Sequence, residues 1–123
     1  MSNFAKLSLA ADAPRAELHD ALKLTGCEVS FNNMPAGVAV PFVHKHKENE
    51  ELYLIVKGSG EFFLDGEIIT LAAGDCVRVD PACERCIKAG AEGLSFYCIQ
   101  TKAGSLEHFT ATDGVACETK AFA

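Results

Sequence analysis

The residue types with the clearest chemical potential lie close together near the middle of the chain: His44, His46 and Glu51. The two histidines are two residues apart, so on an extended strand both side chains point to the same face. Glu51 begins the next apolar run, where its carboxylate could turn back toward the histidines. Imidazole is the commonest protein ligand of metal ions, and two nitrogens with one carboxylate oxygen suit a divalent transition metal with open coordination positions. A charged turn on a solvated strand is the alternative that the spacing leaves open.

The elements that must position these residues have the composition of β-strands. From residue 27 onward, runs of β-branched and aromatic residues alternate with turn residues such as Asp65-Gly66, a pair that favours a type I′ hairpin turn. Pro41 lacks an N–H group and indicates an edge or a bulge. The expected strands are 28–33, 38–46, 51–57, 61–64, 67–71, 76–80, 86–89 and 94–101. Short strands at this spacing predict an all-β sandwich or barrel.

The two ends of the chain have different patterns. Residues 15–24 predict a short helix, because an Asp-Ala-Pro sequence precedes them and a glycine follows them. Residues 102–123 are less regular. The apolar side chains of this tail could pack a further strand against the barrel or against a partner subunit: Phe109, Val115 and Phe122.

Length and composition narrow the class of protein. A chain of 123 residues with 49% hydrophobic and 23% charged residues suits one soluble globular domain. No apolar run approaches the roughly 20 residues of a membrane helix, so no membrane partner is expected. The net charge is −6 and the basic residues do not cluster, which argues against nucleic acid as a partner. The N-terminal residues lack the apolar core of a signal peptide, so a cytoplasmic location is expected.

Two motifs resemble those of the cupin superfamily. The first is His44-x-His46 followed by Glu51 and Gly58, although six residues rather than the usual five separate the histidines from the preceding glycine, Gly37. The second runs from Gly74-Asp75 to Pro81-Ala-Cys-Glu-Arg-Cys86, where the family has Pro-x-Gly-x-x-His. The resemblance covers about residues 29–101. It implies one cupin domain over residues 1–123: a small double-stranded β-helix, or jelly-roll-like barrel, with a short N-terminal helix.

The resemblance also implies a ligand set, in which Cys86 stands where the family has its fourth metal ligand. If residues 86–89 are extended, Cys86 and Lys88 share one face and Ile87 takes the other, and the family places its ligand inward. Three alternatives follow: ligation by His44, His46, Glu51 and Cys86, ligation by the first three alone, or no tightly bound metal. A thiolate would favour Zn(II) or Fe(II), with Mn(II) and Ni(II) as the other candidates for the divalent metal ion.

Other residues near the motifs are candidates for ligand recognition. Arg85 could clamp a carboxylate or phosphate with its planar guanidinium, or form a surface ion pair with Glu84 or Asp80. Tyr53 shares a strand face with Glu51 and could bind a ligand or simply pack. Cys83-x-x-Cys86 has the spacing of half a zinc site or of a redox pair, but there is no second such motif and the pair lies in a turn between strands.

By resemblance, the leading hypothesis is a metal-binding cupin that acts on a small polar metabolite with dioxygenase-like or isomerase-like chemistry. The alternative is a cupin that binds a sugar or organic acid without catalysis, its metal structural or absent. A redox-sensing thiol protein is a third hypothesis. Small cupins commonly pair, so a homodimer is expected. Because function depends on the site, the fold does not choose among these hypotheses.

Overall fold

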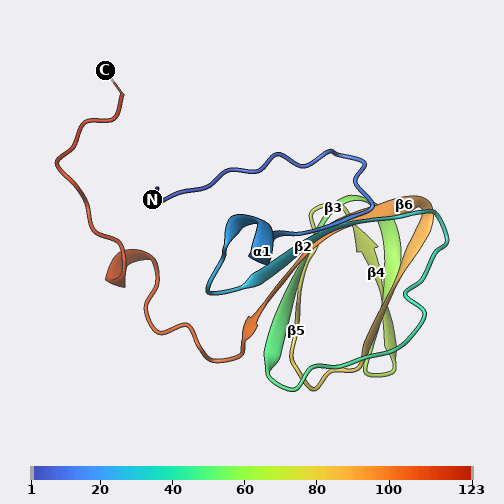
Figure 1. Ribbon diagram of the computed structural model, residues 1–123. Coiled ribbons are helices and arrows are strands. Elements are labelled where there is room, and N and C mark those ends of the chain that lie inside the picture. The colour runs from blue at the N-terminus through green and yellow to red at the C-terminus, as the bar shows by residue number, and fades with distance from the viewer. Residues whose placement is uncertain (1, 123) are drawn as a thin grey trace.

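The computed structural model describes residues 2–122 and is built almost entirely of antiparallel β-sheet (Figure 1). Its elements are β1 (Arg15–Glu17), α1 (Leu18–Leu22), β2 (Glu28–Met34), β3 (Asn49–Leu64), β4 (Glu67–Ala72), β5 (Cys76–Val79), β6 (Arg85–Lys102) and the 3₁₀ turn η1 (Thr110–Thr112). The predicted all-β class is therefore confirmed. No helix among residues 2–122 has the length and apolar character needed to cross a membrane.

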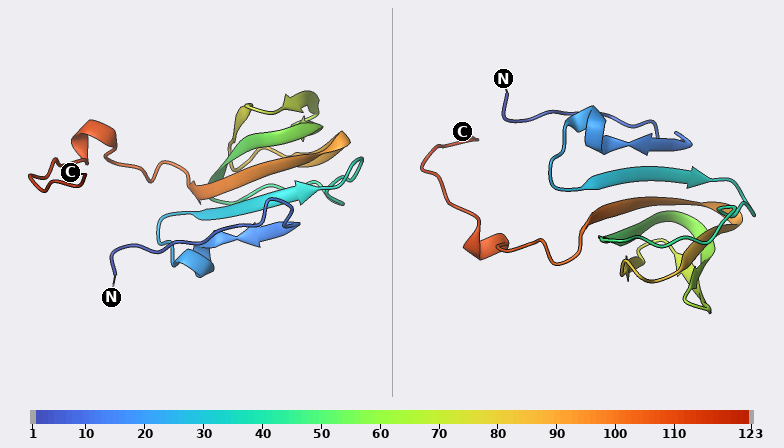
Figure 2. Two further views of the ribbon diagram at one scale, coloured as in Figure 1. Left: turned by 90° about the horizontal axis from the view of Figure 1, so that it is seen from above. Right: turned by 60° about the horizontal axis from the view of Figure 1, so that its bottom comes forward.

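The sheet is organised around its two longest strands, β3 and β6, which pair with each other along most of their length. The strand order is β1-β2-β6-β3-β4, and β5 pairs with the first part of β3. The sheet bends strongly, so that β4 and β5 fold over the face on which the core lies (Figure 2). Among the described residues the ladder does not close into a complete ring.

Two glycines approach each other closely where the register of β3 on β6 shifts. Gly58 has φ +85° and Gly93 has φ +79°, a region that L-residues with side chains rarely adopt. A Cβ atom on Gly58 would lie 2.1 Å from the carbonyl oxygen of Gly93. The register of β3 on β6 shifts on either side of this point. The sequence predicts separate strands with turns at 58–60 and 90–93, but the chain continues through both points with irregular pairing, so β3 and β6 each replace two expected strands.

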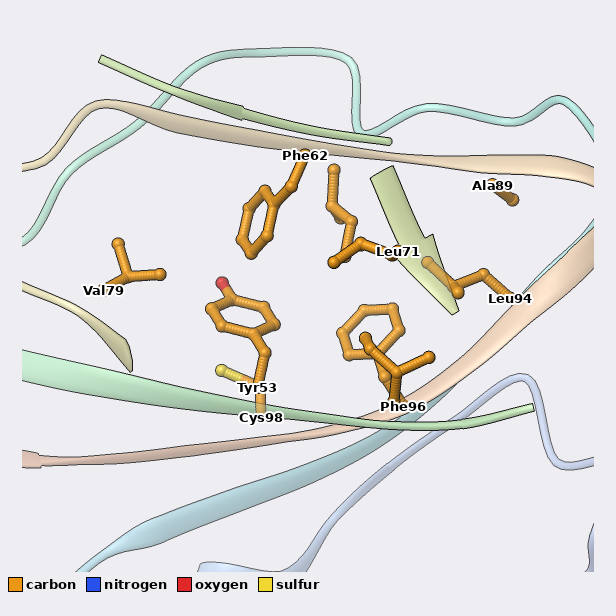
Figure 3. Close-up of a cluster of buried hydrophobic side chains, with 10 residues drawn as sticks. Tyr53, Phe62, Leu71, Val79, Ala89, Leu94, Phe96 and Cys98 are labelled. Carbon is orange, nitrogen blue, oxygen red and sulfur yellow. The ribbon is translucent and has the colours of Figure 1, made fainter. Parts of the chain in front are cut away.

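The core lies on the concave face of the sheet, where aromatic side chains from different strands meet (Figure 3). The rings of Tyr53 and Phe62 are 4.7 Å apart between centroids and inclined at 74°. In β3 the buried residues alternate, and Glu51, Tyr53 and Ile55 all face inward. The carboxylate of Glu51 therefore points into the same interior as the aromatic core, as its shared face with Tyr53 predicts.

The segment from residue 38 to 46 is not a strand, in contrast to the prediction. It runs beside the first part of β6 and makes only isolated bridges, Ala39 with Lys88 and His44 with Arg85. Pro41 lies between the two bridges, and because proline has no N–H group it cannot continue the ladder. The indication that Pro41 gives of an edge or a bulge is thus correct, and the continuous strand is wrong.

The N-terminal helix is shorter than predicted. Arg15–Glu17 forms β1, which pairs antiparallel with Ser30–Asn32 of β2, and only the five residues of α1 are helical. No residue of α1 is buried, so packing adds little to its intrinsic propensity, and backbone pairing with an open sheet edge decides the conformation of the preceding residues. By contrast, Asp65 and Gly66 both have positive φ, as the predicted hairpin turn requires.

The C-terminal tail extends away from the sheet (Figure 1). Its large apolar side chains are exposed by 64% at Phe109, 86% at Val115 and 97% at Phe122. The prediction that this tail packs a further strand against its own barrel is therefore wrong for the described residues. Its packing against a partner subunit stays a prediction.

Candidate metal centre

The two histidines are fixed by backbone hydrogen bonds to the first residue of β6 and to the turn that precedes it. The N–H and C=O groups of His44 both bond to the backbone of Arg85, at 3.1 and 2.9 Å. The N–H group of His46 donates to the carbonyl oxygen of Pro81 at 2.9 Å. Because the hydrogen-bonded residues are two apart, the backbone here has the two-residue repeat of a strand, and both imidazoles project to the same side. Their rings lie 5.3 Å apart between centroids.

His44, His46 and Glu51 converge as the sequence predicts. One ligand atom from each of the three lies within 4.8 Å of the others. His46 Nε2 is 3.2 Å from Glu51 Oε2, but the geometry is not that of a hydrogen bond, and both this atom and His44 Nδ1 are buried without a hydrogen-bond partner. Buried polar atoms normally have a partner. Two unpartnered imidazole nitrogens beside a carboxylate are the donor set that a divalent metal ion satisfies.

Glu51 is held rigidly by three side chains. Its Oε1 accepts hydrogen bonds from the hydroxyl of Tyr53 at 2.7 Å and from Arg85 Nη1 at 2.6 Å. The thiol of Cys98 donates to Oε2 at 3.3 Å. Burial alone would raise the pKa of Glu51, but the hydrogen bonds from Tyr53, Arg85 and Cys98 together outweigh burial and hold that pKa below its ordinary value. Glu51 is therefore ionised, and Oε2 is the oxygen turned toward the histidines.

Arg85 lies in the interior, with a relative exposure of 1%. Besides Glu51, its guanidinium donates to the carbonyl oxygens of Asp80, Pro81 and Cys83 at 2.8 to 3.0 Å. The alternative of a surface ion pair is thus wrong. These contacts give Arg85 a positioning role toward Glu51, of the kind that orients metal ligands. A direct contact between Arg85 and a bound ligand stays a prediction.

Cys86 occupies a different position from the one expected by periodicity. The buried residues of this part of β6 are Arg85, Ile87 and Ala89, while Cys86 is half-buried and Lys88 is exposed. The inward face is thus the opposite one from that predicted. The thiol of Cys86 still lines the cavity and donates to the carbonyl oxygen of Val40 at 3.2 Å. Among the described residues the three-membered cluster does not include Cys86, and its ligation of a metal stays a prediction.

The environment favours the metal-binding form of His44. Burial lowers the pKa of His44, and the nearby His46 and Arg85 lower it further, against the opposing effect of the Glu51 carboxylate. A lowered pKa keeps the imidazole neutral, which is the form that binds a metal. The structure thus places a neutral His44 imidazole and an ionised carboxylate beside the ring of His46.

A cavity of about 610 Å³ opens beside the cluster. Sequence reasoning did not single out several polar residues of its wall: Arg15, Ser30, Asn32, Cys98 and Gln100. Ser30 and Asn32 are nearly fully buried, at 6% and 7% exposure. Their two-residue spacing predicts a shared face, but the strand EVSFNNM carries four polar residues, so the sequence alone does not mark that face as buried. Arg15 could not be found that way, because the stretch around it was expected to be helical.

Comparison with known proteins identifies the class that this fold and site define. A sequence model of the cupin domain matches residues 31–100, more than half of the chain, so the protein belongs to the cupin family. A cupin protein from Bacteroides fragilis is 55% identical, with 95% of this chain and 99% of that chain covered and a TM-score of 0.92. The resemblance seen in the two motifs is confirmed.

More distant solved structures share the fold. A predicted oxalate decarboxylase from Thermotoga maritima is 26% identical over 72% of this chain and 78% of its own, with a TM-score of 0.60. A sugar phosphate isomerase of the cupin superfamily from Silicibacter pomeroyi is 19% identical over 73% of this chain and 60% of its own, with a TM-score of 0.63. No curated protein matches the chain.

Proposed function

We propose that this protein is a divalent-metal-binding cupin in which His44, His46 and Glu51 hold the metal, and that it acts on a small polar metabolite bound in the adjoining cavity. One observation carries the proposal: two buried imidazole nitrogens without a hydrogen-bond partner lie beside an ionised carboxylate, with all three ligand atoms within 4.8 Å. Zn(II) and Fe(II) are the metals that we expect.

The residues around the cluster suit a site for chemistry more than a closed structural site. Three protein ligands leave coordination positions open, whereas structural zinc sites are usually closed by four protein side chains. A bound metal with open positions supplies Lewis acidity and activates water. The chain itself keeps Glu51 ionised and oriented through Tyr53 and Arg85. Apolar side chains such as Phe96 form part of the cavity wall.

The names of two structural neighbours, an oxalate decarboxylase and a sugar phosphate isomerase, are compatible with a small polar substrate but do not identify one. The alternative of a non-catalytic binding cupin uses the same cavity. A cytoplasmic location and a homodimer remain expectations. The homodimer would be tested by light scattering on the full chain.

Metal binding is tested by reconstituting the purified protein with Zn(II) or, without oxygen, Fe(II), and then measuring metal content after desalting. We expect about one metal ion per chain in the wild type and a loss of at least about tenfold in affinity for His44→Ala and His46→Ala, because each removes a ligand. His19→Ala is the matched control, since His19 lies on α1 and pairs with Asp20 away from the cavity.

The variant Cys86→Ala decides between the ligand sets. Retention of metal by Cys86→Ala supports the three-residue site. Loss of metal in that variant would instead make Cys86 a ligand. A wild-type protein that holds no metal after reconstitution would overturn the proposal.

A further inference from the structure

We propose that the cavity takes a small organic acid whose anionic group, at the end remote from the metal, is bound by Arg15. This inference deepens the proposed function and rests on it, since the other end of the ligand would bind at the metal centre. Arg15 is part of β1, the strand that replaces the first turn of the expected helix.

The charges that line the cavity favour an anion. Three ionised side chains contribute to the wall: Arg15, Glu51 and Arg85. Glu51 and Arg85 neutralise each other through a contact of 2.6 Å that is almost completely buried. The positive charge of Arg15 is left over on the wall, and a divalent metal would add two more. A cavity with such an excess of positive charge attracts anionic ligands and disfavours cationic ones.

The guanidinium of Arg15 is held in place by the buried polar residues of β2. Its Nη1 donates to Asn32 Oδ1 at 2.6 Å, and the amide of Asn32 donates in turn to the hydroxyl of Ser30 at 3.0 Å. Within the described chain, Nη2 makes no hydrogen bond. A guanidinium held in this way keeps Nη2 free to donate a charge-assisted hydrogen bond to a carboxylate or phosphate.

Glu17, whose carboxylate already contacts Arg15, competes only weakly with an anionic ligand for this guanidinium. Glu17 accepts from Arg15 Nε at 3.2 Å, but the two side chains are exposed by 58% and 60%. Exposed ion pairs of this kind contribute little free energy because water and salt screen them. Glu17 does not contribute to the cavity wall. Arg15 can therefore bind a ligand while Nε keeps its contact with Glu17.

Inward residues of neighbouring strands link Arg15 to the metal centre along a diagonal of the sheet. Arg15 pairs with Asn32 on β2, and the next inward residue of β2, Ser30, pairs with Cys98 on β6. Cys98 in turn donates to Glu51 on β3. Three strand spacings of about 4.8 Å separate the two backbones across the sheet, and Arg15 also lies opposite Ile55, four residues along β3 from Glu51. The bend of the sheet and the length of the arginine side chain shorten the gap between the two side-chain tips. The ligand therefore spans the cavity that Arg15 and the metal centre share.

The test uses Co(II)-loaded protein, whose visible absorption reports on ligands that enter the coordination sphere. Wild type is titrated with succinate, glutarate and adipate and, separately, with their monomethyl esters, in which a neutral methyl ester replaces the distal carboxylate. We expect at least one diacid to bind about tenfold more tightly than its ester, as one added charge-assisted hydrogen-bonding contact implies. Acetate, which lacks a distal group, measures binding at the metal alone.

Variants assign the preference to Arg15. Arg15→Gln should bind diacid and ester equally, with unchanged affinity for acetate and for Co(II), and Arg15→Lys should keep part of the preference. Arg78→Gln is the matched control, because Arg78 forms an exposed ion pair with Asp80 and does not line the cavity. A preference that persists in Arg15→Gln would overturn the inference.

The two levels of the proposal fail in different ways. A wild-type protein that does not bind Co(II) would overturn the metal centre. A protein that binds Co(II) and acetate but treats diacids and their esters alike at every length would leave the metal centre intact and overturn the role of Arg15.

Discussion

Replacing Arg85 with methionine should destabilise the fold strongly, because it breaks a buried ion pair. Arg85 and Glu51 have side-chain exposures of 1% and 5%, and their charged atoms are 2.6 Å apart. Arg85→Met leaves the Glu51 carboxylate buried with only neutral donors, and it removes four hydrogen bonds to backbone carbonyl oxygens. Breaking a buried pair by removing one partner costs about 3–5 kcal/mol, a large part of a total stability of about 5–15 kcal/mol.

Equilibrium unfolding in urea, with a chelator present to keep the protein free of metal, measures this cost. For an m-value of about 1.5 kcal/mol/M, the midpoint of Arg85→Met should fall by roughly 2–3 M with the m-value unchanged. Arg78→Met is the control, since Arg78 and Asp80 form an ion pair with exposures of 73% and 63%. Its midpoint should change by less than about 0.7 M, because exposed pairs contribute at most about 1 kcal/mol.

A double variant separates the ion pair from the packing of the arginine. If the buried charge of Glu51 is what makes Arg85→Met costly, then adding Glu51→Gln removes that charge and restores part of the stability. The combined cost should be smaller than the sum of the two single costs by about 1–3 kcal/mol. Strictly additive costs, or a midpoint for Arg85→Met equal to that of the Arg78 control, would refute the reasoning.

Three further predictions concern the bend, the thiols and pH. Gly58→Ala should lower Tm by more than about 10 °C, because the new Cβ would lie 2.1 Å from a carbonyl oxygen. Gly66→Ala, whose Cβ would have nothing within 4 Å, should lower Tm by only about 3–6 °C. Equal shifts in Tm would contradict the close approach of Gly58 to Gly93. Burial raises the pKa of Cys98 to about 12. In native protein at pH 8, iodoacetamide should therefore modify the exposed Cys76 and leave Cys98 unreacted, as measured by mass spectrometry of the peptides. Equal labelling of the two cysteines would show that Cys98 is accessible. The lowered pKa of Glu51 means that its ionised form stabilises the metal-free fold above the ordinary value of 4.5, and that this contribution is lost as pH falls through the folded-state pKa. Urea unfolding curves give the difference in free energy of unfolding between wild type and Glu51→Gln, and this difference should shrink between about pH 6 and about pH 3. A difference that stays constant over this range would contradict a stabilising role of the ionised Glu51.

Much of the fold could be predicted because its cause is local. Alternating apolar residues and turn pairs such as Asp65-Gly66 specify strands and hairpins within a few residues. The errors occurred where distant partners decide the conformation. Arg15–Glu17 becomes a strand because the edge of β2 offers backbone partners. The predicted turn at Gly58 became a bulge because Gly93, far away in the sequence, lies against it.

The metal-binding residues also divide into features that the sequence specifies and features that distant partners specify. The sequence by itself determined the fold class and the three residues that converge, since His44 and His46 share a face by their spacing and Glu51 begins the strand that follows. Only the tertiary structure decided what surrounds them. It turned Arg85 inward onto Glu51 and gave Cys86 a backbone partner, because the register between β3 and β6 sets which face of a strand is buried. It also brought Arg15 to the cavity, because cross-strand neighbours depend on pairing and not on distance along the chain.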